Sequence, residues 1–332
     1  MKKTYKGVPF SILELALVNE ASDEATALKN SLEFAQKADE LGFHRFWLAE
    51  HHNMPGVASS ATSILIAYIA DNTERIRVGS GGVMLPNHAP LIIAEQFGTL
   101  ATLYPDRIDL GIGRAPGTDQ ATAYALRRSL QSEGEMFPEL LAELRSYFES
   151  DNNAYVQAIP GRGLNVPVWL LGSSDYSARL AASLGLPFSF ASHFAPRLLN
   201  EALAIYHQHF LPSQVLDKPN AMVAVNIIAA DTDEEAEYIA SSLKRKFLHL
   251  AQGITAKFQP PSEEPFSDYE EALFTRSLDP LTTMIGSKET IEHKLEALLE
   301  QTAADELIIS SSIYDQAARL RSLEIIAQLF DN

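Results

Sequence analysis

A carboxylate and two imidazoles stand side by side at Glu50-His51-His52, where a predicted strand over 43–50 ends and a turn begins. The ordinary pKa of imidazole, about 6.5, lets a histidine give or take a proton near neutral pH. Zinc ligation is disfavoured, because neighbouring strand residues point to opposite faces, the motif lacks His-x-His or His-Glu-x-x-His spacing, and the chain has no Cys. We therefore predict Glu50, His51 and His52 as the catalytic group and no bound metal, with a packing histidine as the alternative.

Glycine occupies three of the four positions 79–82, at the end of a strand predicted over 76–83. Glycines weaken a strand that serves only for packing, so they indicate that something approaches the backbone. Gly81 and Gly82 therefore favour a flat ligand ring lying against the chain, held with a strained or cis peptide. A β-bulge at the rim of the sheet is the alternative.

Two further segments have the chemistry of a phosphate site. Arg114 follows a strand predicted over 107–112, and its guanidinium can bind phosphate through two parallel hydrogen bonds. The segment 172–177 (Gly-Ser-Ser-Asp-Tyr-Ser) follows a strand over 166–171 and opens a helix, so N–H groups and hydroxyls converge at the positive end of the helix dipole. The alternatives are an ion pair of Arg114 with Asp119 and ordinary capping of the helix by Ser or Asp.

Other polar residues carry weaker signals. The run 111–117 is not a dinucleotide-binding motif, because its third glycine is displaced by one position and Pro116 interrupts the helix start. Side chains after the later strands that could face a site are His193, Asn226 and Ser310–Ser312. Residues assigned to surface or packing positions are His207, His209, His249, His293 and the helix face Lys244, Arg245 and Lys246.

Strand and helix patterns alternate along the chain, which favours a parallel sheet, because parallel neighbours need crossover connections. Eight strands are predicted, over 8–17, 43–50, 76–83, 107–112, 166–171, 188–191, 222–229 and 306–310. Eight such units predict a single α/β domain over 1–332, a (β/α)8 TIM barrel, with a doubly wound open sheet as the alternative. Insertions after the fourth and seventh strands are expected over 115–165 and 252–287, and the polar run 260–265 indicates a mobile lid.

Composition excludes several classes of function. The 332 residues carry 26 Lys+Arg and 43 Asp+Glu, a net charge of −17, and no basic stretch that could follow a nucleic-acid backbone. No apolar run approaches the roughly 18 residues of a spanning helix, and no secretory stretch follows Met1. A cytoplasmic protein that binds neither membrane nor nucleic acid is expected. Without Cys, any redox chemistry needs a bound cofactor.

Together these motifs resemble the bacterial luciferase-like flavin monooxygenases, and in particular their single-subunit branch. The resemblance covers nearly the whole chain. It is carried by Trp47-Leu48-Ala49-Glu50-His51-His52 and by the segments 79–90, 105–114, 172–177, 285–287 and 305–307. Where luciferase itself has a reactive cysteine, this chain has Gly113, so thiol chemistry at that position is not implied.

The resemblance implies a binding site for FMN, formed by Gly81, Gly82, Arg114, Ser173, Ser174 and Ser177. Gly81-Gly82 matches a non-prolyl cis peptide that supports the isoalloxazine ring, and Arg114 matches an arginine that contacts the flavin phosphate. The hydroxyls of Ser174 and Ser177 and the main chain of Ser173 match further phosphate contacts. His51 matches a histidine that acts as base or proton donor near the flavin.

The function implied is that of an FMN-dependent monooxygenase. Reduced FMN would come from a separate reductase as a cosubstrate, and one atom of O2 would be transferred to a small organic substrate. Family members commonly form dimers through early helices, so a homodimer is expected, with 64–68 as an apolar stretch suited to it. Light emission is not implied. The alternatives are deazaflavin-dependent hydride transfer, a noncatalytic flavin-binding protein, and a barrel aldolase or isomerase acting on phosphate esters.

Overall fold

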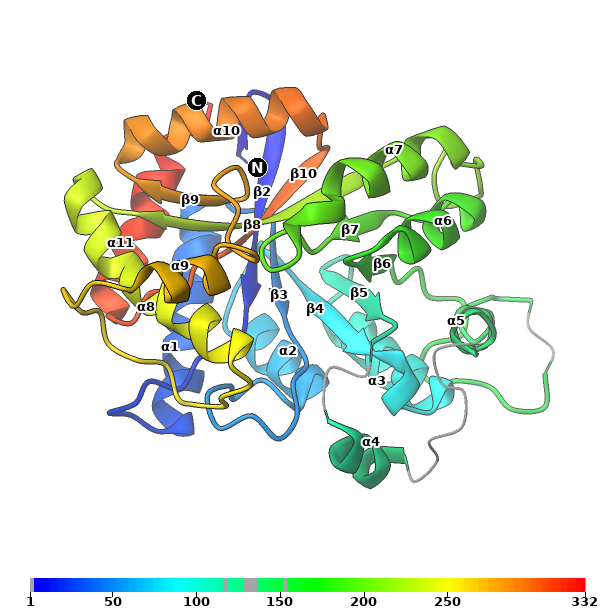
Figure 1. Ribbon diagram of the computed structural model, residues 1–332. Helices are drawn as coiled ribbons and strands as arrows, with labels where there is room; N and C mark the ends of the chain where they lie inside the picture. The colour runs from blue at the N-terminus through cyan, green and yellow to red at the C-terminus, as the bar shows by residue number, and fades with distance from the viewer. Residues whose placement is uncertain (1–2, 116–118, 128–135, 152–153, 332) are drawn as a thin grey trace.

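The computed structural model describes residues 3–115, 119–127, 136–151 and 154–331 (Figure 1). Its strands are β1 (Thr4–Tyr5), β2 (Val8–Glu14), β3 (Arg45–Leu48), β4 (Arg77–Met84), β5 (Ile108–Gly113), β6 (Val168–Gly172), β7 (Phe188–Phe190), β8 (Ala221–Ala229), β9 (Thr283–Gly286) and β10 (Glu306–Ser310). Its α-helices are α1 (Glu24–Leu41), α2 (Thr62–Asp71), α3 (Pro90–Leu103), α4 (Gln120–Arg127), α5 (Phe137–Ser146), α6 (Asp175–Leu184), α7 (Leu199–His209), α8 (Asp233–Ala251), α9 (Asp268–Phe274), α10 (Lys288–Thr302) and α11 (Gln316–Ala327).

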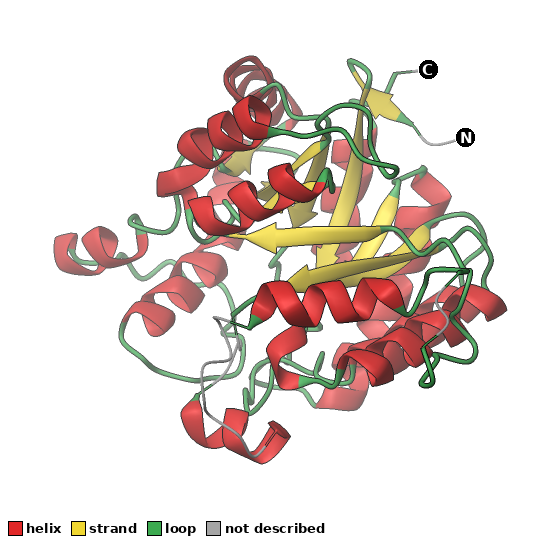
Figure 2. Ribbon diagram, turned by 90° about the vertical axis from the view of Figure 1, so that its right-hand side faces the viewer, coloured by secondary structure: helices red, strands yellow, loops and turns green. Residues whose placement is uncertain are grey.

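Eight parallel strands close into a barrel. Their order is β2-β3-β4-β5-β6-β7-β8-β10, and pairing of β10 with β2 completes the circle. Helices surround the strands, as Figure 2 shows from the side. The two ends of the described chain meet, because the Asp331 N–H donates to the Thr4 carbonyl oxygen over 2.6 Å. The predicted TIM barrel is therefore confirmed, and the open doubly wound sheet is excluded.

The eight barrel strands are the eight that the sequence predicts, with ends that shift by up to three residues. The second predicted insertion, 252–287, contains the helix α9 and the strand β9, which the sequence analysis did not predict. This strand pairs with the last four residues of β8 in parallel, from Asn226 opposite Thr283 to Ala229 opposite Gly286. The prediction missed it because four residues are too few to give a clear pattern of alternation.

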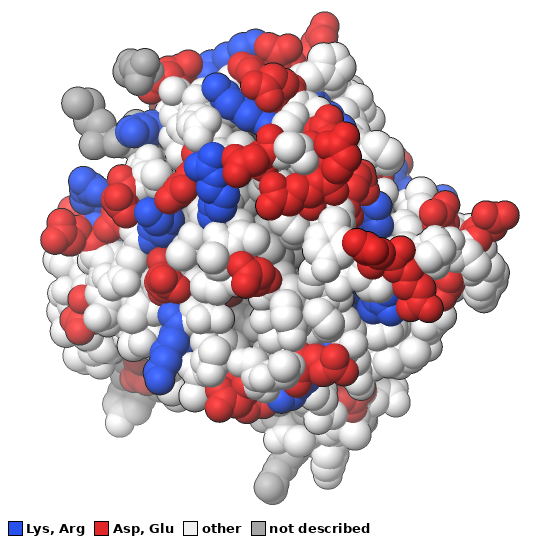
Figure 3. Space-filling view, turned by 90° about the vertical axis from the view of Figure 1, so that its left-hand side faces the viewer, with Lys and Arg blue, Asp and Glu red and all other residues white. Residues whose placement is uncertain are grey.

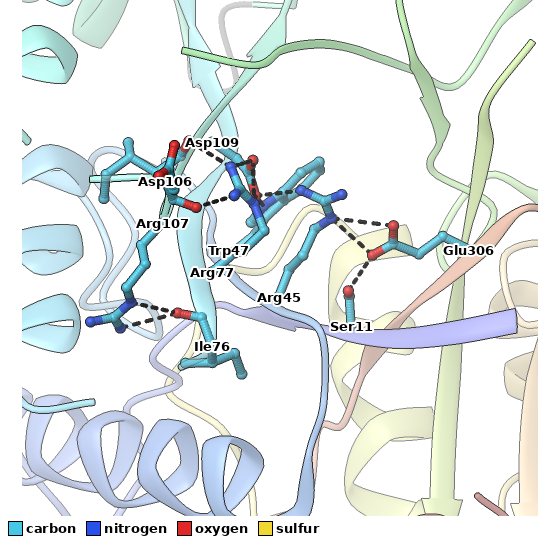
Figure 4. A network of polar contacts seen from close by, with 10 residues as sticks. Ser11, Arg45, Trp47, Ile76, Arg77, Asp106, Arg107, Asp109 and Glu306 are labelled. Atoms are coloured by element: carbon cyan, nitrogen blue, oxygen red, sulfur yellow. Dashed lines mark hydrogen bonds and ion pairs between the residues drawn. The ribbon is translucent and has the colours of Figure 1, made fainter. Parts of the chain in front are cut away.

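Charged residues fill the amino end of the barrel (Figure 4). Asp109 is fully buried and accepts hydrogen bonds from Arg45 Nη1 at 2.7 Å, Arg77 Nη2 at 2.6 Å and Trp47 Nε1 at 3.2 Å. Arg45 Nε also lies 3.0 Å from Glu306 Oε1. Arg45, Arg77 and Glu306 stand at the first positions of β3, β4 and β10, and Asp109 stands at the second position of β5. Barrel closure therefore brings together charges that are distant in the sequence. In this fold the amino end serves stability and the carboxyl end carries the active site.

The pKa values of the two carboxyls in this network move in opposite directions. Burial alone would raise the pKa of Asp109, but Arg45 and Arg77 outweigh it and hold the pKa below its usual value. Burial raises the pKa of Glu306, and its single arginine partner, Arg45, only partly offsets this effect. Asp109 is therefore the anion on which the two guanidinium groups converge.

An apolar layer separates this network from the carboxyl end. Trp47 and Trp169 pack edge to face with ring centroids 5.5 Å apart, and the Arg45 guanidinium lies 5.0 Å from the Trp169 ring. Leu13, Met222, Ala224 and Ile308 complete this layer. It excludes water from the buried charges below and gives the cavity above it an apolar floor.

Acidic side chains gather on the face shown in Figure 3, and the basic side chains on that face lie among them without forming a continuous stripe. In the described part of the chain, no helix combines the length and the apolar character needed to cross a bilayer.

Candidate active site

A cavity of about 450 Å³ lies at the carboxyl ends of the barrel strands. Of the nine residues predicted for the site, seven line it: His51, Gly81, Gly82, Arg114, Ser173, Ser174 and Ser177. The segment 254–259 forms one wall and is held to the loop after β2, where the Phe258 N–H donates to the Val18 carbonyl oxygen over 2.8 Å. The cavity therefore collects the predicted residues from four different strand ends.

The glycine pair on β4 has both a cis peptide and an irregular strand register, the two features that the sequence analysis considers for it. The Gly81–Gly82 peptide is cis, as the family resemblance implies, and the register of β4 against β5 shifts between Ser80 and Val83. A Cβ at Gly82 would lie 2.7 Å from the Gly111 carbonyl oxygen, and a Cβ at Gly81 would lie 2.7 Å from Leu13 Cδ1. Neither position has room for a side chain, and both present bare backbone to the cavity.

Arg114 and the start of α6 form a polar end of the cavity. The Arg114 guanidinium lies 4.1 Å from the Tyr176 ring centroid, and no described residue forms an ion pair with it. Asp119, the alternative partner, instead accepts hydrogen bonds from Thr122 and Asn53, which lower its pKa to about 2. Ser174 is the extended N-cap residue of α6, yet its hydroxyl makes no capping hydrogen bond. A cation, hydroxyls and uncapped N–H groups thus converge where an anion would bind.

The three residues Glu50-His51-His52 divide between two environments. His51 lines the cavity, whereas Glu50 and His52 do not. Glu50 Oε1 lies 2.8 Å from both His52 Nε2 and His88 Nε2, and its Oε2 accepts the Met84 N–H over 3.1 Å. Burial favours the neutral form of Glu50, but His88 and His52 outweigh it, so its pKa is lowered. Successive residues face opposite ways, which leaves His51 as the member of the motif that faces a ligand.

The ligand atoms of Glu50, His52 and His88 lie within 4.8 Å of one another, which is close enough for a metal ion. Both imidazoles already contact the same carboxylate oxygen, an arrangement that holds Glu50 in place beside β4. The absence of a metal stays a prediction.

The model of the luciferase-like monooxygenase family matches residues 8–306, which includes the whole barrel up to the first residue of β10. The chain belongs to this family. An Escherichia coli protein described as a luciferase-like monooxygenase is 50% identical over 97% of both chains. A Bacillus subtilis protein named N-acetyl-S-alkylcysteine monooxygenase is 32% identical, over 96% of this chain and 97% of its own.

Solved structures agree with this assignment. The structure of apo-MsnO8 is similar to this luciferase-like chain with a TM-score of 0.88 and 36% identity, over 97% of this chain and 98% of that one. Two more distant structures share the fold. The oxygenating constituent of 3,6-diketocamphane monooxygenase from Pseudomonas putida, in complex with FMN, has a TM-score of 0.73, 18% identity and 97% coverage of both chains. An F420-dependent secondary alcohol dehydrogenase has a TM-score of 0.72, 14% identity and full coverage of both.

Helix α8 of this luciferase-like chain supplies residues that the sequence analysis misplaced. Lys246 was expected on a solvated face and His249 at a surface or packing position, but both line the cavity, together with Leu250. His249 follows Lys246 by three positions and Leu250 follows it by four, which puts all three on one side of the helix. That spacing was visible in the sequence, but nothing there showed that this side of α8 faces the cavity.

His193, a weak candidate in the sequence, also lines the cavity. Its Nδ1 is buried and has no hydrogen-bond partner among the described residues. Burial, followed by the nearby Lys246 and His51, lowers its pKa to about 3. His193 is therefore a neutral imidazole at physiological pH, with one ring nitrogen left for a ligand or a water molecule.

Most aromatic residues of the two insertions lie away from the cavity. Of Phe137, Tyr147, Phe258, Phe266 and Tyr269, only Phe258 lines the cavity. Phe137 is buried in the main core, Phe266 packs against Phe274, and Tyr269 is exposed. Aliphatic strand residues, including Leu13, Leu171, Ala224 and Ile308, form much of the wall instead, and the segment 254–259 adds both apolar and polar side chains.

Proposed function

We propose that this protein is an FMN-dependent monooxygenase that uses O2 and reduced FMN, delivered by a separate reductase, to oxygenate a small organic substrate. The observation that carries the proposal is Arg114, which forms no ion pair with any described residue, beside the uncapped start of α6. Both lie at one end of a largely apolar cavity that contains the bare Gly81–Gly82 backbone and His51. Family membership and the named activity of the Bacillus subtilis relative support the same reaction class.

The residues present fit FMN in chemistry. FMN combines a dianionic phosphate with a flat, largely apolar ring system. Arg114, Ser173, Ser174 and Ser177 offer donors to the phosphate, and Gly81 and Gly82 let a ring approach the backbone over the floor formed by Leu13 and Trp47. The hydrogen-bond donors near Arg114 and the exposed backbone of Gly81 and Gly82 are the features that fit FMN.

Reduced FMN, when bound, supplies the electrons with which O2 is activated for transfer of one oxygen atom to the substrate. The chain's own contribution is position and protection. Arg114 and the start of α6 hold the phosphate, the glycine pair fixes the plane of the ring, and the wall 254–259 limits entry of water. The His51 imidazole gives or takes a proton beside the ring, as its place in the cavity allows.

A deazaflavin-dependent hydride transfer is the second candidate. An F420-dependent alcohol dehydrogenase has the same fold, and coenzyme F420 also carries a phosphate that Arg114 could bind. Parallel fluorescence titrations with FMN and F420 separate the two. Binding of FMN at least tenfold tighter supports the monooxygenase, and the reverse preference supports hydride transfer.

Replacing Arg114 by Met is expected to weaken FMN binding by roughly 10- to 100-fold, because a charge-assisted hydrogen bond contributes about 1.5–3 kcal/mol. Quenching of flavin fluorescence measures the affinity. Riboflavin, which lacks the phosphate, is the internal control, and its affinity should be the same for wild-type and R114M protein. Equal losses for both flavins would place Arg114 away from the phosphate.

A homodimer is the quaternary structure that we propose. Ile64 and Tyr68 on α2 and Ile92 and Leu103 on α3 expose large apolar surfaces on two neighbouring helices, with Ile64 68% exposed. We expect Ile64→Arg to convert the dimer to monomer in sedimentation velocity, because a buried unpaired charge opposes association. Tyr269→Arg, on the exposed face of α9, is the matched control and should stay dimeric. A wild-type monomer at micromolar concentration would contradict the proposal.

A further inference from the structure

The ammonium group of Lys246 is a cation without a counterion on the wall of the cavity. Its Nζ lies 3.3 Å from Ser312 Oγ, and among the residues that the structure describes no carboxylate lies within 4.0 Å of it. Lys244, two positions earlier on α8, differs in this respect, because its Nζ lies 2.5 Å from Glu237 Oε2 on the outer side of the helix. Lys246 therefore presents its amino group to a largely apolar space, with no carboxylate of the described residues beside it.

The charged groups around Lys246 do not neutralise it. Glu14 is the acid whose charge acts on Lys246, and it already has other partners. It pairs with Arg319 and accepts hydrogen bonds from the Ser31 hydroxyl at 2.7 Å and the Ala16 N–H at 2.8 Å. His193, on the other side, is neutral. Burial, opposed by Glu14 and reinforced by Arg319, lowers the pKa of Lys246 to about 8. An anion next to Nζ would relieve this unfavourable state.

Lys246 lies across the cavity from the proposed phosphate site. Arg114 follows β5 and Ser173–Ser177 follow β6, whereas Ser312, which contacts Lys246, follows β10. In the circular order of the barrel, β10 and β2 lie opposite β5 and β6. Between the two cationic ends the cavity is lined mainly by apolar side chains, including Leu13, Leu171, Ala224, Phe258 and Ile308. The polar side chains His51, His193, Asn226 and Ser310 lie among them.

We propose that Lys246 is a specificity-determining residue that binds a carboxylate of the substrate, so that the enzyme acts on small organic acids with an apolar body. The proposal deepens the proposed function and rests on it for the location of the cofactor. The carboxylate takes the place next to Nζ and Ser312 Oγ, and the apolar remainder of the substrate extends toward the glycine pair. Lys246 itself moves no proton in the reaction; it selects the substrate and orients it.

Three variants of α8 test this assignment. Lys246→Met removes the charge and keeps an apolar side chain of similar length, Lys246→Arg keeps the charge, and Lys244→Met removes the charge of the lysine that already has a partner. The probes are straight-chain carboxylates from butyrate to octanoate and their uncharged amides, with affinities measured by isothermal titration calorimetry on the full-length protein.

We expect wild-type and K244M protein to bind at least one carboxylate tenfold or more tightly than the amide of the same length. K246M should lose this preference and K246R should retain most of it. The preference should also fade as the pH rises through about 8, where Lys246 loses its proton. Equal affinities for acid and amide in the wild type, or a preference that persists in K246M, would overturn the proposal.

A parallel titration with FMN separates this inference from the proposed function. K246M should bind FMN with wild-type affinity; a tenfold loss of FMN affinity would make Lys246 a cofactor contact and also overturn the proposal. If FMN fails to bind the wild type while the carboxylate preference holds, the proposed function fails and the acid-binding site remains. If the wild type binds FMN but shows no preference for carboxylates over amides, the assignment of Lys246 fails and the proposed function stands.

Discussion

Replacing Asp109 by Ala is expected to lower the free energy of unfolding by about 3–5 kcal/mol, because the change removes a fully buried carboxylate and leaves two partly buried guanidinium groups without their shared anion. Arg45 and Arg77 both lie within 2.7 Å of this carboxylate, and Asp109 itself is fully buried. Arg45 would keep Glu306, but Arg77 has no second carboxylate within 4.0 Å among the described residues. Urea unfolding followed by circular dichroism measures the loss.

Glu296→Ala is the matched control, because Glu296 forms an exposed ion pair with Lys6. Exposed pairs contribute roughly 0–1 kcal/mol, so this variant should unfold close to the wild type. If D109A loses no more stability than E296A, the amino-end network does not stabilise the barrel as described.

The lowered pKa of Asp109 predicts that the stabilisation from this network decreases in acid. The pKa of Asp109 is lowered in the folded protein, so its contribution is present above the ordinary aspartate pKa of about 3.9 and is lost as the pH falls toward the lowered value. We therefore expect the stability difference between wild-type and D109A protein to shrink in strongly acidic buffer.

Replacing His51 by Ala is expected to reduce turnover by roughly 10²–10⁴-fold while FMN affinity stays within about twofold of the wild type. The imidazole lies in the cavity, whereas the phosphate contacts come from other strand ends, so the two effects should separate. The measurement is single-turnover oxidation of a substrate found by aerobic screening with a reductase, NADH, FMN and small organic acids. A noncatalytic flavin-binding protein would yield no product in that screen.

His52→Gln is the control for this prediction. Its imidazole is held by Glu50 and does not line the cavity, so the variant should lose far less activity than H51A. Single-turnover rates that are unchanged in H51A would remove His51 from the mechanism, and a larger loss in H52Q would return the catalytic role to the Glu50–His52 pair.

Much of the fold and the polar end of the site could be predicted, because both follow from the local pattern of strand, turn and helix. Arg114 and the segment 172–177 follow buried strands, and parallel strands carry their carboxyl ends to one edge. The alternation of side chains along a strand also predicts that His51 faces the opposite side from Glu50 and His52. All three residues are nevertheless assigned to catalysis in the sequence analysis.

What the sequence could not reveal depends on how distant elements face one another. Lys246 and His249 looked like an ordinary helix surface until α8 was seen to cover the cavity. Arg45, Asp109 and Glu306 are single charges at three strand starts, and only closure of the barrel brings them into contact. The aromatic residues of the insertions illustrate the same limit, since composition does not tell which of their side chains turn toward the cavity.

The central claim is that a flavin occupies the carboxyl end of the barrel with its phosphate at Arg114, and a crystal structure of the protein soaked with FMN tests it most directly. The account predicts phosphate density between the Arg114 guanidinium and the first N–H groups of α6, with the ring against Gly81 and Gly82. Density for FMN elsewhere on the molecule, or an unliganded site at an FMN concentration that saturates binding in solution, would contradict it.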